Sequence, residues 1–221
     1  MTRITHCLPF VLLFVCLSHS GDIEEEGSAS VPFEEDEQYF CYQNVTDAAN
    51  INGKIYVKIQ NFQGIFPPKC DSAERVQKID DTHYIFTLAA EIPKVPKVLV
   101  KFNTSVVLSK TGNHTDYNAM TYRYTTLEPP MLRKLMYLSP NKTCMIFAEN
   151  RNSSENAQCQ LFQPAEFAND TIPADCAQVY RANCPGPSNF TVYNPECQSL
   201  REIPVQALMQ NKTTTSAPEE C

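Results

Sequence analysis

Cysteine and histidine could carry the most specific chemistry in this chain, so their number and spacing come first. Two of the ten cysteines, Cys7 and Cys16, lie in an N-terminal apolar stretch. The remaining eight form an even set, which in a secreted chain predicts disulfides in place of metal sites. These eight are Cys41, Cys70, Cys144, Cys159, Cys176, Cys184, Cys197 and Cys221.

Catalytic groupings are absent from the sequence pattern. Only two histidines follow the N-terminal stretch, His83 and His114, and neither belongs to a nucleophile triad or a metal-ligand cluster. His114 lies inside a glycosylation sequon and is therefore expected at the surface. With only six glycines, the chain offers no glycine-rich phosphate loop. The sequence thus predicts no enzyme, no metal and no cofactor.

The N-terminus has the pattern of a secretory signal peptide over residues 1–20. Arg3 supplies a positive start, residues 8–17 an apolar core, and Ser18 and Ser20 small residues near a cleavage point. Eight asparagines stand in Asn-X-Ser/Thr sequons, which supports a secreted, extracellular glycoprotein. The sequon asparagines are Asn44, Asn103, Asn113, Asn141, Asn152, Asn169, Asn189 and Asn211.

The net charge of -7 is concentrated in one segment. Residues 21–38 carry eight acidic residues and no lysine or arginine, whereas acidic and basic residues balance after residue 38. This composition predicts a disordered acidic arm over 21–38. The barrel-forming domain is expected over 39–200, and residues 201–221, rich in Thr, Ser and Pro, are expected as a flexible tail. Without a basic patch or a later span of about 20 apolar residues, neither nucleic acid nor membrane is an expected partner.

Short alternating segments bounded by Gly, Pro, Asn and Asp predict an all-β fold of eight antiparallel strands followed by a short helix. An eight-stranded lipocalin-like barrel fits this pattern and can hold one small ligand. An immunoglobulin-like sandwich is disfavoured because the chain has no tryptophan. The strands are expected at 54–59, 75–79, 84–90, 97–108, 120–127, 132–138, 143–148 and 158–163, and the helix at 173–182.

A motif in the second half of the chain resembles one of the tick salivary lipocalins, a family that includes histamine-binding proteins. It consists of Cys144-Met145-Ile146, Gln160-Leu161-Phe162 and Cys176. The family motif runs C-[DE]-[VIL], then E-L-[WY], then C. Here Met145 and Gln160 replace the acidic residues that pair with amines, and Phe162 replaces the Trp or Tyr. A second landmark, Asp-Ala-Trp, appears as Asp47-Ala48-Ala49. The resemblance covers about residues 40–200.

By this resemblance, Cys70 is expected to pair with Cys197 and Cys144 with Cys176. Partners for Cys41, Cys159, Cys184 and Cys221 stay unassigned. Each bridge would contribute on the order of 2 to 4 kcal/mol.

Strand alternation predicts which side chains face the barrel lumen. The expected lumen is uncharged and mostly apolar, which suits a fatty acid, eicosanoid or sterol better than histamine or serotonin. Arg133 is the candidate partner for a ligand carboxylate if its strand faces inward with Leu135 and Tyr137. The opposite parity would place it at the surface. The expected ligand-binding residues are Phe86, Val100, Phe102, Tyr122, Tyr124, Tyr137, Met145, Phe147, Gln160 and Phe162.

The expected function is sequestration of a small host mediator by a monomeric salivary protein, which would suppress host inflammation or haemostasis. One alternative is an amine ligand held by other acidic residues, such as Glu91 or Glu149. A second alternative is inhibition of host complement, coagulation or chemokine proteins through the surface or the acidic arm, where Tyr39 has a sequence context compatible with sulfation.

Overall fold

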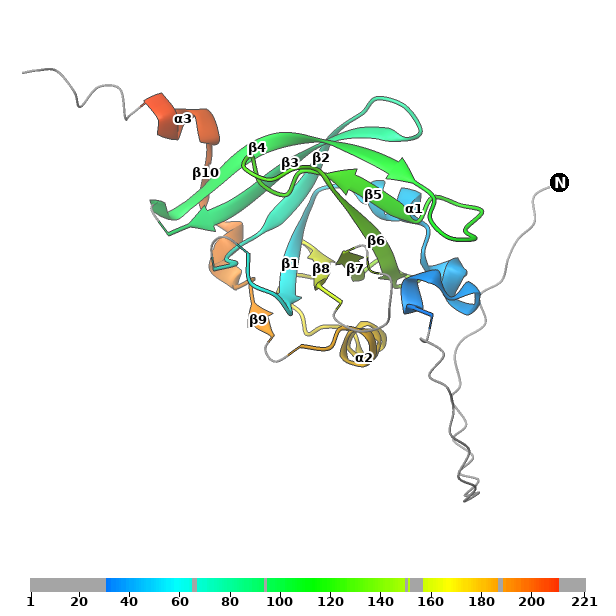
Figure 1. The fold of residues 1–221 in the computed structure, drawn as a ribbon. Coiled ribbons are helices and arrows are strands. Elements are labelled where there is room, and N and C mark those ends of the chain that lie inside the picture. Colours follow the sequence, from blue (N-terminus) through cyan, green and yellow to red (C-terminus); the bar gives the residue numbers. More distant parts are fainter. Residues whose placement is uncertain are drawn as a thin grey trace, which may run out of the picture.

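Eight antiparallel strands close into a barrel, as the sequence predicts (Figure 1). Each strand pairs with its neighbours in the chain, β8 returns to pair with β1, and β4 pairs with β5. The strands are β1 Lys54–Gln60, β2 Ser72–Lys78, β3 His83–Ile92, β4 Val95–Ser109, β5 Ala119–Tyr122, β6 Met131–Leu138, β7 Met145–Glu149 and β8 Cys159–Pro164.

The computed structural model describes residues 31–64, 67–93, 95–149, 151, 157–186 and 189–210. The expected signal peptide, most of the acidic arm, Cys221 and the sequons at Asn152 and Asn211 lie outside these residues. The other sequon asparagines are exposed at 103, 113, 141, 169 and 189 and partly exposed at 44.

Two β-bulges change the inward-facing residues from those expected. Ile55 and Val57 face the lumen, but the register shifts between Val57 and Ile59, so Ile59 packs outside the barrel and Gln60 faces inward. A second shift lies between Leu135 and Tyr137 in β6. Because one extra residue reverses the alternation that follows it, simple parity fails beyond each bulge.

The segment before the barrel is folded, so the expectation of disorder is wrong for residues 33–38. Two 3₁₀-helices, η1 Phe33–Glu35 and η2 Glu37–Tyr42, pack beside β6 (Figure 1). Glu34 is fully buried and forms a bidentate pair with Arg151 at 2.8 and 2.9 Å, and Glu35 lies 2.5 Å from Lys134. Composition alone missed this because the cations lie more than 90 positions away in the chain.

Helix α2, Ala174–Asn183, follows Pro173 and covers β7 and β8 on the outside of the barrel (Figure 1). Two disulfides fasten it there: Cys144–Cys176, as the resemblance implied, and Cys159–Cys184. Their buried sulfurs belong to an outer apolar cluster that contains Ile146 and Leu161. Cys41 is also disulfide-bonded.

The chain after α2 crosses the outer face of the barrel through β9 Phe190–Thr191, which pairs with β1, and η3 Pro195–Gln198. The disulfide Cys70–Cys197, also implied by the resemblance, anchors this segment beside Tyr56 and Leu99. The expected flexible tail is wrong for residues 201–210, because β10 Arg201–Pro204 pairs with β4 and α3 Val205–Gln210 follows it. Ladder hydrogen bonds at the edge of β4 order this segment.

Among the described residues, no helix has the length and apolar character needed to cross a bilayer.

Candidate functional site: a cavity with a buried polar cluster

The barrel encloses a cavity of about 830 Å³ that is open at one end. This volume lies within the range of about 300 to 1,000 Å³ typical of drug-sized ligand sites. Helix α1, Val45–Ala49, capped by the side chain of Asn44, closes the other end with Ala48 and Ala49.

Most of the predicted ligand-binding residues line the cavity. The eight that do are Phe86, Val100, Phe102, Tyr122, Tyr124, Met145, Phe147 and Phe162. Tyr137 does not, because the β6 bulge turns it outward, where its hydroxyl donates to Asp175 at 2.9 Å. Gln160 lies behind the wall: its amide nitrogen donates to Gln60 at 2.9 Å and to the Tyr124 hydroxyl at 3.0 Å.

Backbone geometry at the start of β2 points Asp71 into the cavity. Cys70 has a left-handed backbone with φ of +56°, its N–H donates to the Val192 carbonyl at 2.9 Å, and its sulfur is bonded to Cys197. The carbonyl of Asp71 accepts from Val57 N–H at 2.9 Å. These restraints fix the carboxylate, which accepts from the Tyr124 hydroxyl.

Asp71 has no cationic partner among the described residues. Burial raises the pKa of this carboxyl to about 6, although its hydrogen bonds to Tyr124 and to the Lys69 backbone act in the opposite direction. Burial is also the main cause that raises the pKa of Tyr124 well above the ordinary value. At neutral pH the cavity therefore holds an ionised carboxylate with no cation beside it.

A second charged group, the pair Arg133 and Glu149, lies on the β6–β7 side of the cavity. The two residues face each other across the ladder with 3.1 Å between Nη2 and Oε1. The guanidinium carbon lies 5.6 Å from the Tyr122 ring centre and 5.1 Å from that of Tyr124, within cation–π range. Arg133 Nε has no hydrogen-bond partner in the described part of the chain, and neither does Gln160 Oε1.

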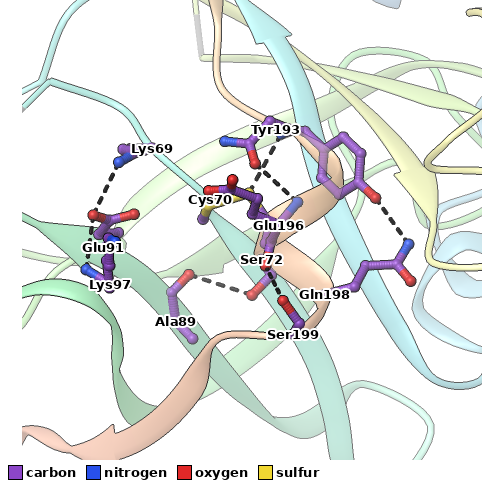
Figure 2. Close-up of a disulfide and its surroundings, with 12 residues drawn as sticks. Lys69, Cys70, Ser72, Ala89, Glu91, Lys97, Tyr193, Glu196, Gln198 and Ser199 are labelled. Carbon is purple, nitrogen blue, oxygen red and sulfur yellow. Dashed lines mark hydrogen bonds and ion pairs between the residues drawn. A yellow bond between two sulfur atoms is a disulfide. The ribbon is translucent and has the colours of Figure 1, made fainter.

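Glu91 stands near the open end and is neutralised by protein groups. It accepts from Lys69 Nζ at 2.9 Å and from the Lys97 backbone N–H at 3.0 Å (Figure 2). The hydrogen bond from the Lys97 backbone N–H has the largest effect in lowering the pKa of this carboxyl. The side chain of Lys69 lowers it further. Glu91 thus has a lysine as its ionic partner, whereas Asp71 has no cationic partner among the described residues.

The expectation of an uncharged lumen is wrong, because Asp71, Glu91, Arg133 and Glu149 all line the cavity. The motif positions Met145 and Gln160 are neutral as predicted, and the charges come from other places in the barrel. Sequence reasoning missed Asp71 entirely. Its inward direction depends on the left-handed backbone of Cys70 and on the bridge to Cys197, for which strand alternation gives no signal.

His114 and the group Cys144, Asp175 and Cys176 have side chains that could do chemistry, but their contacts give them structural roles. His114 is buried, contrary to expectation, and bonds to Gln43 Oε1 and the Thr111 carbonyl at 2.8 Å each, with burial lowering its pKa. Of the described residues, Cys144, Asp175 and Cys176 have metal-type ligand atoms close together. The two sulfurs are bonded to each other, so they are not available as thiolate ligands.

A family model described as tick histamine binding protein matches residues 33–199. This chain belongs to the tick histamine-binding protein family. The match begins at η1, which agrees with the structured N-terminal segment. No curated protein sequence matches the chain significantly.

Several solved structures have a similar fold. Japanin from Rhipicephalus appendiculatus bound to cholesterol is 10% identical with a TM-score of 0.50, over 67% of this chain and 97% of that chain. The AM182 serotonin complex is 11% identical with a TM-score of 0.51, over 71% and 92%. Lobster apocrustacyanin A1 is 13% identical with a TM-score of 0.51, over 78% and 92%. At these identities the likeness shows a shared lipocalin fold.

Proposed function

We propose that this protein sequesters a small, largely apolar molecule with one polar end, such as a sterol, eicosanoid or fatty acid. The observation that carries the proposal is the cavity of about 830 Å³, walled by aromatic and aliphatic side chains and carrying polar groups around Tyr124. An apolar body would gain about 25 cal/mol for each Å² removed from water. The binding of cholesterol by japanin, a protein of similar fold, supports this ligand class.

The biological setting that fits is a secreted salivary protein that lowers the free concentration of a host mediator and so suppresses inflammation or haemostasis. The signal-peptide pattern, the sequons and the disulfides support secretion. A monomer is sufficient for this role, because the whole cavity is built from one chain. An alternative activity is inhibition of host complement, coagulation or chemokine proteins through the surface or the acidic segment 21–38.

A biogenic amine is the second candidate, and Asp71 favours it. An ammonium group would give this carboxylate the cation that the described protein groups do not supply. Gln160 occupies an acidic position of the family motif, and the Tyr124 hydroxyl contacts both Gln160 and Asp71. Asp71, which directly precedes β2, would thus supply a carboxylate close to this motif position. The AM182 serotonin complex supports an amine in this fold.

A binding panel separates the candidates. Protein from a secretory host would be analysed by native mass spectrometry for co-purified ligand and then titrated with cholesterol, an eicosanoid, a fatty acid, histamine and serotonin. Ala90→Trp fills the cavity wall and should abolish uptake, whereas Ala182→Trp on the exposed face of α2 should leave it intact. Equal uptake by both variants, or uptake of none of the five compounds by the wild type, would refute ligand binding in the barrel.

A further inference from the structure

The neighbouring barrel strand β5 leaves most of one edge of β4 unpaired. β4 is 15 residues long, but β5 has only four and pairs with β4 only from Val107 to Ser109. The half of β4 that leads to the cavity mouth therefore needs another partner on this edge. β10 supplies one, in parallel register from Val98 to Lys101.

The segment Arg201–Gln210, here termed the C-terminal strap, also reaches the ligand space. Val205 and Leu208 of α3 line the cavity, and α3 contacts both β10 and β4. Gln206, between them in sequence, is exposed. The strap thus contributes an apolar face to a cavity otherwise built from residues 48–162.

The attachments of the strap to the barrel are few and mostly polar. Its ladder with β4 is four residues long, and one of the four, Pro204, has no N–H to donate. Glu202 forms ion pairs with Lys54 and, at 2.8 Å, with Lys101, all partly exposed. Exposed ion pairs contribute only about 0 to 1 kcal/mol each.

The strap nevertheless cannot leave the molecule. The Cys70–Cys197 disulfide holds the chain four residues before Arg201, and Ser199 donates to the Glu196 carbonyl at 2.9 Å (Figure 2). A strongly fixed base followed by a weakly attached end is the arrangement of a hinged flap, with the hinge at Ser199 and Leu200.

We propose that the C-terminal strap is the gate of the cavity: it separates from β4 to admit the ligand and returns so that Val205 and Leu208 contact it. This inference rests on the proposed function, because a gate requires a ligand. Opening would break the short β10 ladder and the Glu202 ion pairs while leaving all eight barrel strands and the Cys70–Cys197 bridge in place. The ligand would then meet β4 at Val100 and Phe102, both cavity-lining residues.

Stopped-flow kinetics test the gate with two fluorescent probes, dehydroergosterol and parinaric acid. Val205→Ser with Leu208→Ser should raise the dissociation rate about tenfold, the factor that corresponds to about 1.4 kcal/mol of lost apolar contact. Glu202→Ala should raise the association and dissociation rates together by several-fold, roughly the factor expected from losing two exposed ion pairs. Gln206→Ser, on the exposed face of the same helix, should change neither rate. Unchanged kinetics in the first two variants, with a probe that binds the wild type, would overturn the gate.

Hydrogen exchange gives a readout that needs no ligand. Glu202→Ala should accelerate amide exchange in residues 201–204 and in the β4 amides that face them, and leave exchange in β7 and β8 unchanged. No acceleration in this variant would contradict the gate even if the probes bind. If neither probe nor any compound of the panel binds, the proposed function fails, and exchange still reports whether the strap opens.

Discussion

The hydroxyl of Tyr124 donates to the carboxylate of Asp71 inside the barrel and joins two residues that lie 53 positions apart. The same hydroxyl accepts from Gln160, so one tyrosine connects the family's motif strand to a carboxylate from the start of β2. This contact makes Asp71 the polar centre of the cavity, and two predictions follow from its charge.

Asp71→Asn should stabilise the empty protein at alkaline pH. The folded-state pKa of about 6 lies above the ordinary value of 3.8, so ionisation opposes folding. The penalty is small near pH 4, grows as the pH rises to about 6, and reaches on the order of 3 kcal/mol at pH 8. Urea unfolding of both proteins at pH 4 and pH 8 measures it. Asp116→Asn, at an exposed carboxylate, is the control, and an equal gain in both variants would refute the assignment.

Ligand affinity should change with pH in opposite directions for the two candidate classes. A neutral sterol excludes water from Asp71 and favours its protonated form, so its affinity should rise as the pH falls from 7.5 to 5. An amine requires the carboxylate, and with a pKa of about 6 the ionised fraction at pH 5 is about one tenth, so its affinity should fall about tenfold. Calorimetric titrations at the two pH values would show the sign. Asp71→Asn should remove the dependence in either case.

Glu34→Ala should destabilise the protein strongly. Glu34 is fully buried, and its removal would break the bidentate pair with the guanidinium of Arg151, whose side chain is only 7% exposed. Breaking a buried pair in this way costs about 3 to 5 kcal/mol. The neighbouring exposed residue gives the control: Glu37→Ala should cost less than about 0.5 kcal/mol. Thermal unfolding of the two variants would decide, and a small loss for Glu34→Ala would show that η1 is not part of the cooperative fold.

Phe162→Trp should report ligand binding by fluorescence. The chain has no tryptophan, and Phe162 is a buried residue of the cavity wall. A single indole there should emit at short wavelength, as expected in an apolar site, and its intensity should change when a ligand enters. Val76→Trp, on the exposed outer face of β2, should emit at longer wavelength, and its intensity should not change when the ligand is added. A response of equal size in both variants would place the ligand outside the barrel.

The sequence was sufficient to predict the eight strands, α2 and two of the disulfide pairs, because alternation is local and the cysteine spacing resembles a known family. It was insufficient where long-range contacts decide the structure. Strand alternation predicts inward positions for Ile59 and Tyr137, because a bulge has no clear local signal. Composition predicts a disordered arm that includes Glu34, because its partner Arg151 is distant in sequence.

The candidate site was predicted less completely than the fold. Aromatic positions such as Phe86 and Phe162 followed from strand parity. Asp71 did not, because its inward direction depends on the left-handed backbone of Cys70 and on a bridge to Cys197. Charged side chains that reach the lumen from strand ends or loops cannot be predicted from alternation within strands.

The three disulfides between described residues and two of the apolar clusters lie on the outside of the barrel, where α2 and the chain around Cys197 cover the strands. These disulfides and outer clusters stabilise the fold without using the cavity surface. Residues of the lining can therefore be exchanged without rebuilding these outer contacts. Met145 and Gln160 are neutral side chains at two positions where the resemblance to the tick salivary lipocalins implies acidic residues.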